Sequence, residues 1–217
     1  QQLLEILLDL RESGGWDYPR MGRPDLSNTQ VAALRARAAH AAGLNVPKAI
    51  WGELVEIVLR HQEKPVDIPG TALLPRDKRR MAGFAYEPGG APSASMTTAG
   101  LTILGIATED PLRVDHRFDV QIEEARQLAL NWLEQHYSVE GNPLGDASWH
   151  YYYLYGLERV GALNNLAKIG EHDWYLDGAA QLLKEQRDDG GWRLDDDHPW
   201  PWPLVTPNTC FSLLFLR

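Results

Sequence analysis

The sequence has little of several features that identify common classes of protein. Cys210 is the only cysteine among 217 residues, so a disulfide framework and a cysteine-rich zinc site are excluded. No apolar run approaches the ~20 residues that a membrane span requires. Basic residues number 21 against 30 acidic ones, and the net charge of −9 repels nucleic acid and anionic lipid alike. We therefore expect neither a nucleic-acid partner nor a membrane span.

Two kinds of helical segment alternate along the chain. Residues 47–62, 118–136 and 174–186 are amphipathic; in the second of these, Glu123, Glu124 and Asn131 are predicted to face water. Residues 97–107, 149–163 and 207–216 have almost no polar face, and residues 30–42 are a weaker, alanine-rich member of the same kind. Because a helix that is apolar all round must be buried all round, the alternation predicts an all-α fold with an inner layer of helices inside an outer one.

The loops that lead from outer to inner helices share a glycine and an aromatic residue. The loops are Gly14-Gly15-Trp16, Gly83-Phe84 and Gly190-Gly191-Trp192, whereas residues 140–148 lack the aromatic residue. Polar clusters suited to capping helices follow them: Ser27-Asn28-Thr29, Ser95-Met96-Thr97, Asp146-Ala147-Ser148 and Pro207-Asn208-Thr209. Units recur about every 50 to 70 residues. An insertion between Gln62 and Gly83, with a basic cluster at residues 76–80, is predicted to be an exposed loop.

The last of these loops carries a resemblance to a known family. Residues 186–192, from Gln186 through Gly190 to Trp192, fit the Q-x-x-x-G-x-W core of the repeat found in squalene-hopene cyclases and related class II terpene cyclases. The other loops match this core less well. The first loop has Leu10 in the glutamine position, and the loops that follow Gln62 and Gln135 differ from the core after the glutamine. As a repeat pattern the whole chain resembles the α/α-toroid superfamily of terpenoid cyclases and protein prenyltransferases.

The resemblance implies a single domain over residues 1–217, an α/α toroid or partial toroid of about four outer–inner pairs. Residues 3–10 would form an incomplete fifth pair. Because the sequence opens at Gln1 inside an apolar helical pattern, we interpret the chain as a piece of a longer protein. Relatives close their rings with five to seven pairs, so four pairs would leave the inner face partly open unless the ring is smaller or a partner covers it. We expect Trp16, Phe84 and Trp192 to be packing residues, with cavity lining as the alternative. The motif glutamine is expected to bond helix-end carbonyls or N–H groups of the next inner helix.

The chemistry of the superfamily requires particular residues. Class II cyclases protonate an alkene with an aspartic acid from a D-x-D-D motif. The nearest counterpart is Asp195-Asp196-Asp197, which lacks that spacing and is typical of a solvated turn; the acid-catalyst reading is the alternative. Prenyltransferases bind zinc through Asp, Cys and His, but Cys210 has no nearby aspartate and is expected to be a small buried hydrophobe. We predict no metal and no cofactor.

A second candidate site lies at the predicted N-terminal ends of the inner helices, where the positive ends of helix dipoles gather. Its predicted lining is mixed polar and aromatic: Asn28, Gln30, Thr98, Trp149, His150, Tyr153 and Asn208. Such a cup would suit a carbohydrate, a peptide end or an anionic group. Ordinary helix packing of the tyrosine-rich segment is the alternative.

Two functional hypotheses follow. The first is a catalytically silent toroid that binds a small molecule or a protein partner within a larger protein. The alternative is an isoprenoid cyclase of the squalene type, or another toroid enzyme such as a polysaccharide lyase. Here Asp195, Asp196 or Asp197 would be the acid, with Tyr or Trp faces as stabilisers. A cyclase needs a deep, dry aromatic pocket with an inward aspartate, whereas a binding module needs only a cup. Whether the chain is an enzyme stays open at this point.

Overall fold

The computed structural model describes residues 1–18, 22–109, 114–193 and 205–217. The fold is all-α, as predicted. The helices are α1 (Gln2–Asp9), α2 (Leu26–Ala41), α3 (Ala49–His61), α4 (Ala94–Glu109), α5 (Asp119–Gln135), α6 (His150–Leu163), α7 (Trp174–Glu185) and α8 (Val205–Leu216). Short 3-10 turns are η1 (Arg76–Lys78), η2 (His116–Phe118) and η3 (Ala147–Trp149). None of the helices in these ranges has the length and apolarity needed to cross a membrane.

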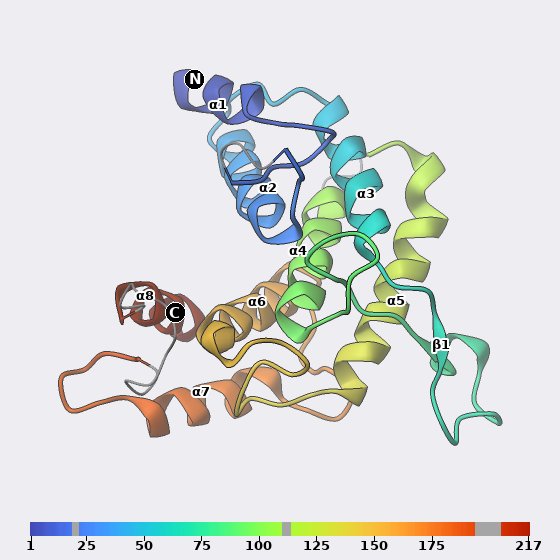
Figure 1. Cartoon of the computed structure of the whole chain (residues 1–217), viewed down its shortest axis with the longest axis vertical. Helices are drawn as coiled ribbons and strands as arrows, with labels where there is room; N and C mark the ends of the chain where they lie inside the picture. Colours follow the sequence, from blue (N-terminus) through green and yellow to red (C-terminus); the bar gives the residue numbers. More distant parts are fainter. Residues whose placement is uncertain (19–21, 110–113, 194–204) are drawn as a thin grey trace.

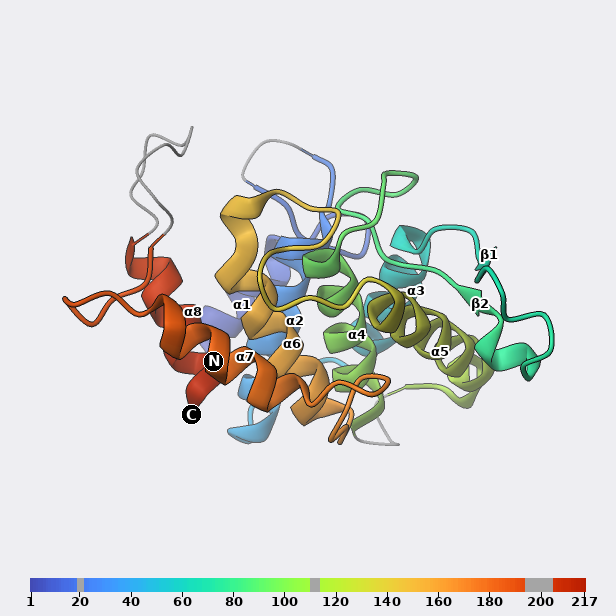
Figure 2. The ribbon, with the colours of Figure 1, turned by 90° about the horizontal axis from the view of Figure 1, so that it is seen from below.

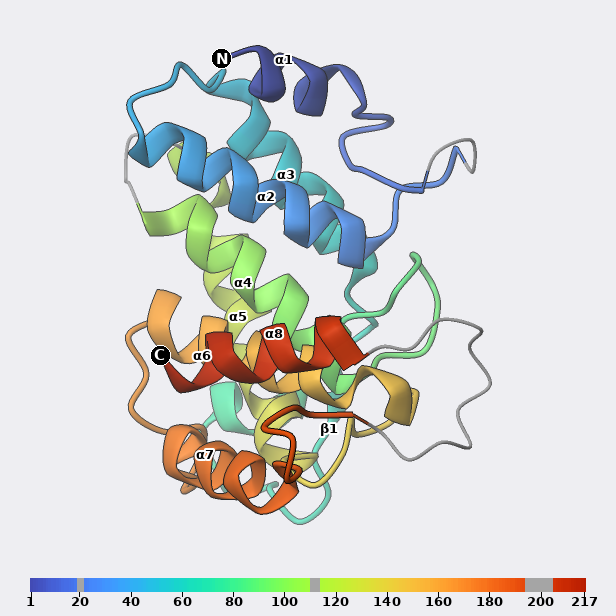
Figure 3. The same cartoon turned by 90° about the vertical axis from the view of Figure 1, so that its left-hand side faces the viewer.

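The helices form two layers. The apolar helices α2, α4, α6 and α8 pack side by side in one curved row, each against the next. On the outer side, α1 packs on α2, α3 and α5 pack on α4, and α7 packs on α6 and α8. Figures 1 and 3 show α2 and α8 at the two ends of this row, with α4 between them. The predicted alternation of inner and outer helices is therefore confirmed.

Burial follows the same division. Every residue of α4 from Ala94 to Ala107 is buried, since the helix has neighbours on all sides. In α6, Tyr151, Tyr152 and Tyr153 are buried as well. The two helices approach closely at Gly156, where an added Cβ would lie 2.3 Å from Thr98 Oγ1. Glycine at this position leaves room for the Thr98 side chain of α4 to pack directly against the backbone of α6.

The N-terminal helix α1 packs against the first helix of the inner row. Helix α1 packs on α2 through its buried residue Leu4. Its carbonyl at Leu7 accepts the indole N–H of Trp16 at 2.7 Å. The segment predicted to be an incomplete fifth pair therefore lies against α2, the first helix of the inner row.

The insertion is exposed, as predicted, but part of it pairs as a small hairpin. Strands β1 (Val66–Asp67) and β2 (Arg80–Met81) are antiparallel, and Figure 2 shows them beside α5. Asn131 of α5 holds this hairpin by donating its side-chain amide to the carbonyls of Asp77 (2.6 Å) and Arg80 (2.7 Å). The prediction that Asn131 faces water was therefore wrong, because the insertion folds back over α5 and covers it.

The expectation for Cys210 was also wrong. Its side chain is exposed on α8. Helix α8 ends the inner row, so α6 and α7 cover only part of its surface. A uniformly apolar helix at the end of a row keeps one face uncovered, which the sequence of the helix alone does not indicate.

Candidate ligand cavity

The loops that lead into the inner helices repeat one hydrogen bond. In three of them the aromatic residue donates its backbone N–H to a threonine hydroxyl on the following inner helix. The pairs are Trp16–Thr29 at 3.1 Å, Phe84–Thr97 at 3.0 Å and Trp192–Thr209 at 3.1 Å. Because a buried backbone N–H must find an acceptor, the threonine fixes where each loop meets its helix.

The two tryptophans also bind the preceding outer helix. The indole N–H of Trp16 donates to Leu7 O at 2.7 Å, and that of Trp192 donates to Leu182 O at 2.8 Å. Trp16, Phe84 and Trp192 are all buried. The packing role predicted for them is confirmed, and each tryptophan joins an outer helix, a loop and an inner helix.

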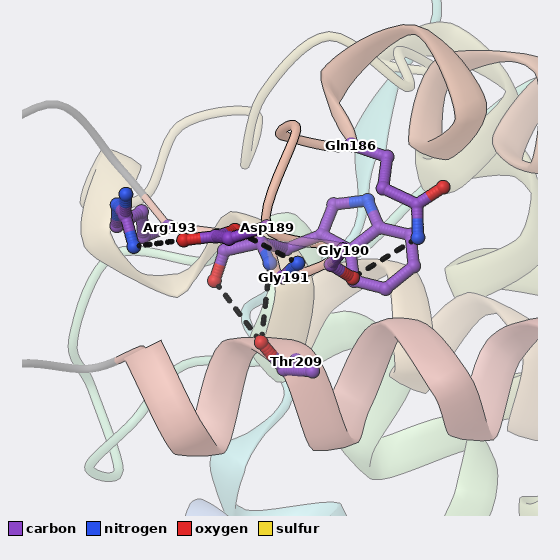
Figure 4. A network of polar contacts seen from close by, with 7 residues as sticks. Gln186, Asp189, Gly190, Gly191, Arg193 and Thr209 are labelled. Atoms are coloured by element: carbon purple, nitrogen blue, oxygen red, sulfur yellow. Dashed lines mark hydrogen bonds and ion pairs between the residues drawn. The ribbon is translucent and has the colours of Figure 1, made fainter.

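The motif glutamine acts more locally than expected. Figure 4 shows the last loop, where Gln186 donates its side-chain amide to Gly190 O at 3.0 Å. Asp189 accepts from the backbone N–H of Gly191 at 3.1 Å and pairs with Arg193 at 2.8 Å. The expectation that Gln186 bonds the end of its own helix or the next inner helix was wrong, because its amide closes the loop on itself.

At the N-terminal ends of α2, α4 and α6 these loops surround a cavity of 820 Å³. Its aromatic lining is Tyr18, Tyr86, Trp149, Tyr152 and Phe211. Its charged lining is Asp25, Glu87, Asp146 and Arg23. The remaining lining residues are small, polar or aliphatic: Ser27, Asn28, Val31, Ser93, Ser95, Met96, Asn142 and Gly145.

Of the residues predicted to form this cup, Asn28 and Trp149 line it. The others are buried behind its wall, each at most 4% exposed: Gln30, Thr98, His150, Tyr153 and Asn208. Tyr152 faces the cavity in place of Tyr153, and its hydroxyl donates to Gln30 Oε1 at 2.5 Å. His150 turns toward the outer layer, where its Nε2 lies 3.3 Å from Glu185 Oε2 of α7. A cavity thus lies at the N-terminal ends of the inner helices, and two of the seven residues predicted for the cup line it.

Side chains of the chain itself occupy the N-terminal ends of these helices. Asp25 accepts from the backbone N–H of Asn28 at 2.8 Å, at the start of α2. Asn142 Oδ1 accepts from the N–H of Ser95 at 2.9 Å, at the start of α4. Asp146 Oδ1 accepts from the N–H of Ser148 at 2.8 Å, in the turn before α6. Each of these N–H groups is thus satisfied by a side chain of the chain.

Sequence reasoning missed Asp25, Tyr86 and Tyr152 as residues of the site. Asp25 was detectable, since an aspartate directly before an apolar helix is an N-cap signal. Burial raises the pKa of Tyr86, and the nearby Asp25 carboxylate raises it further. Burial also raises the pKa of Tyr152. Both phenols are therefore neutral donors and aromatic surfaces at physiological pH.

Three further observations bear on function. The candidate acids Asp195, Asp196 and Asp197 lie outside the described residues. Within those residues, no group of three or more His, Cys, Asp or Glu side chains could hold a metal ion. Comparison of the chain with protein-family models, curated proteins and solved structures finds no match. Function must therefore be inferred from the cavity itself.

Proposed function

We propose that this chain is a ligand-binding module of the α/α-toroid type, catalytically silent and part of a larger protein. The cavity at the N-terminal ends of its inner helices is the binding site. The observation that carries the proposal is the 820 Å³ cavity lined by aromatic residues from separate repeats. Its volume falls within the range of small-molecule sites, roughly 300 to 1,000 Å³.

The cavity wall is held together by contacts between repeats, which supports a preformed site. Asn142 belongs to the loop between α5 and α6, and its side chain is buried. Its amide donates to Ser95 Oγ and to Asp146 O, both at 3.1 Å. On the other side, Tyr152 of α6 joins Gln30 of α2. A site built from such cross-linked elements loses little entropy when it binds a ligand.

Blocking the cavity tests this proposal. Val31 lines the cavity from α2 and is 43% exposed, so Val31→Trp places an indole in the cavity without disturbing the core. Ala38→Trp is the matched control, since Ala38 is exposed two turns further along the same helix and is absent from the described lining.

The assay is saturation-transfer NMR with a fragment library of neutral aromatics, sugars, ammonium compounds and carboxylates. We expect fragments that bind the natural chain to bind Ala38→Trp equally and to lose their signal with Val31→Trp. Binding that Val31→Trp leaves unchanged, or no binding at all, would contradict the proposal. Cyclised product after incubation with squalene would contradict catalytic silence and favour the enzyme alternative.

A further inference from the structure

The charge of the cavity is the clearest guide to its ligand. The attraction of an anion to helix N-termini depends on backbone N–H groups that are free to bind it. Asp25, Asn142 and Asp146 already accept N–H groups at the three helix starts around the cavity. Two of these acceptors are carboxylates, so the chain's own negative charges already neutralise the positive ends of the helix dipoles.

Acidic side chains also outnumber basic ones in the wall. Asp25, Glu87 and Asp146 line the cavity, and Arg23 is the single basic side chain in the described part of its lining. An anionic ligand would meet like charge from these carboxylates, whereas a cation would meet opposite charge. Charge complementarity therefore favours a cation over an anion.

The aromatic residues favour the same kind of ligand. Trp149 and Tyr86 line the cavity and are 37% and 41% exposed, so much of their aromatic surface is open to a ligand. Tyr152 and Phe211 add further aromatic surface, with ring centroids 5.5 Å apart. The negative faces of tryptophan and tyrosine attract ammonium groups, and several such faces around one space are the usual recognition device for methylated ammonium.

A carbohydrate fits these observations less well, because sugar recognition needs free hydrogen-bonding groups on the wall. The amide of Asn142 is engaged at both ends, with Ser95 and with Asp146. The amide nitrogen of Asn28 donates to Asp25 Oδ2 at 2.7 Å. The side-chain amides in the wall are therefore largely used within the chain.

We propose that the cavity binds an organic cation, an ammonium group on a small apolar carrier. The cation lies against Trp149 and Tyr86 and is balanced by the carboxylates of Glu87 and Asp146. This inference rests on the proposed function, that the cavity is a ligand site.

Choline and its uncharged isostere 3,3-dimethylbutan-1-ol provide the direct test, because they have nearly the same shape and differ in charge. Cellobiose and benzoate serve as the sugar and anion probes. In calorimetric or NMR titrations we expect choline to bind about tenfold more tightly than the isostere. We also expect the affinity for choline to fall as salt is added, since part of the attraction is screened.

Charge-removing variants locate the effect. Glu87→Gln and Asp146→Asn each keep the shape of the side chain, and asparagine still caps the turn before α6. We expect each variant to weaken choline binding about fivefold and to leave binding of the isostere unchanged. Glu171→Gln is the matched control, since Glu171 is exposed beyond the opposite end of α6, and it should change neither affinity.

The outcomes separate the two proposals. Equal binding of choline and its isostere, tighter binding of cellobiose or benzoate, or no effect of Glu87→Gln and Asp146→Asn would overturn the inference. The same holds if choline does not bind. If other fragments then still bind in a manner that Val31→Trp abolishes, the proposed function stands and only the cation preference fails. If no fragment binds, both proposals fail.

Discussion

Thr97→Val removes the hydroxyl that accepts the backbone N–H of Phe84 at 3.0 Å and leaves the shape of the side chain almost unchanged. Both residues are fully buried, so water cannot replace the lost acceptor. A buried N–H group that has no hydrogen-bond acceptor destabilises the folded state by about 1 to 3 kcal/mol. We expect the free energy of unfolding to fall by that amount in urea denaturation followed by circular dichroism, with an unchanged dependence on urea concentration.

Thr102→Val is the matched control on the same helix. Thr102 is also fully buried, but its hydroxyl has no hydrogen-bond partner among the described residues. We expect this variant to be as stable as the natural chain or more stable, because it removes a buried hydroxyl that has no hydrogen-bond partner among the described residues. Thr29→Val should behave like Thr97→Val, since Thr29 holds Trp16 in the same way. Equal costs at Thr97 and Thr102 would refute the idea that the threonine hydroxyl fixes each repeat.

Three other predictions concern packing, pH and the hairpin. Gly156→Ala would place a Cβ 2.3 Å from Thr98 Oγ1. We expect this variant to be less stable than the natural chain, because overpacking costs about 1 to 3 kcal/mol and exceeds the ~1 kcal/mol gain in helix propensity. An unchanged melting temperature would contradict this. Burial raises the pKa of Glu185, but hydrogen bonding, first of all with His150, outweighs burial, so the net pKa is lowered. The ionised Glu185 carboxylate therefore stabilises the fold above the ordinary glutamate pKa of about 4.3, and this stabilisation is lost as pH falls through the lowered pKa. Between about pH 6 and pH 3, the free energy of unfolding should fall less steeply for Glu185→Gln than for the natural chain. Asn131→Leu should release residues 66–81 from α5, and unchanged hydrogen exchange there would show that other contacts hold the hairpin.

The layered fold was predictable because its signal is repeated along the chain. Uniform apolarity in residues 97–107 and 149–163 can only be satisfied by neighbours on all sides, and α4 and α6 have them. Cys210 shows where this reasoning fails: apolarity does not indicate whether a helix lies inside the row or ends it. The exposed side of α8 depends on its place in the row.

The location of the cavity was also predictable, since loop signatures and capping residues mark the starts of the inner helices. Its exact lining was not. Tyr152 and Tyr153 are adjacent and chemically alike, and about 100° of helical rotation decides which faces the cavity. That rotation is set by packing with α4 and α8. Asn131 was assigned to the surface for a similar reason, since the sequence does not show that the hairpin folds back over α5.

The central claim, that this cavity is a ligand site, is tested most directly at the indole of Trp149. In the chain labelled with ¹⁵N at tryptophan, we predict that a binding fragment shifts the indole N–H signal of Trp149. The signals of Trp16 and Trp192, whose indoles donate to helix carbonyls outside the cavity, should stay in place. The shift should disappear in Val31→Trp. If Trp149 does not respond to any fragment of the library, or responds equally when the cavity is blocked, the account is contradicted.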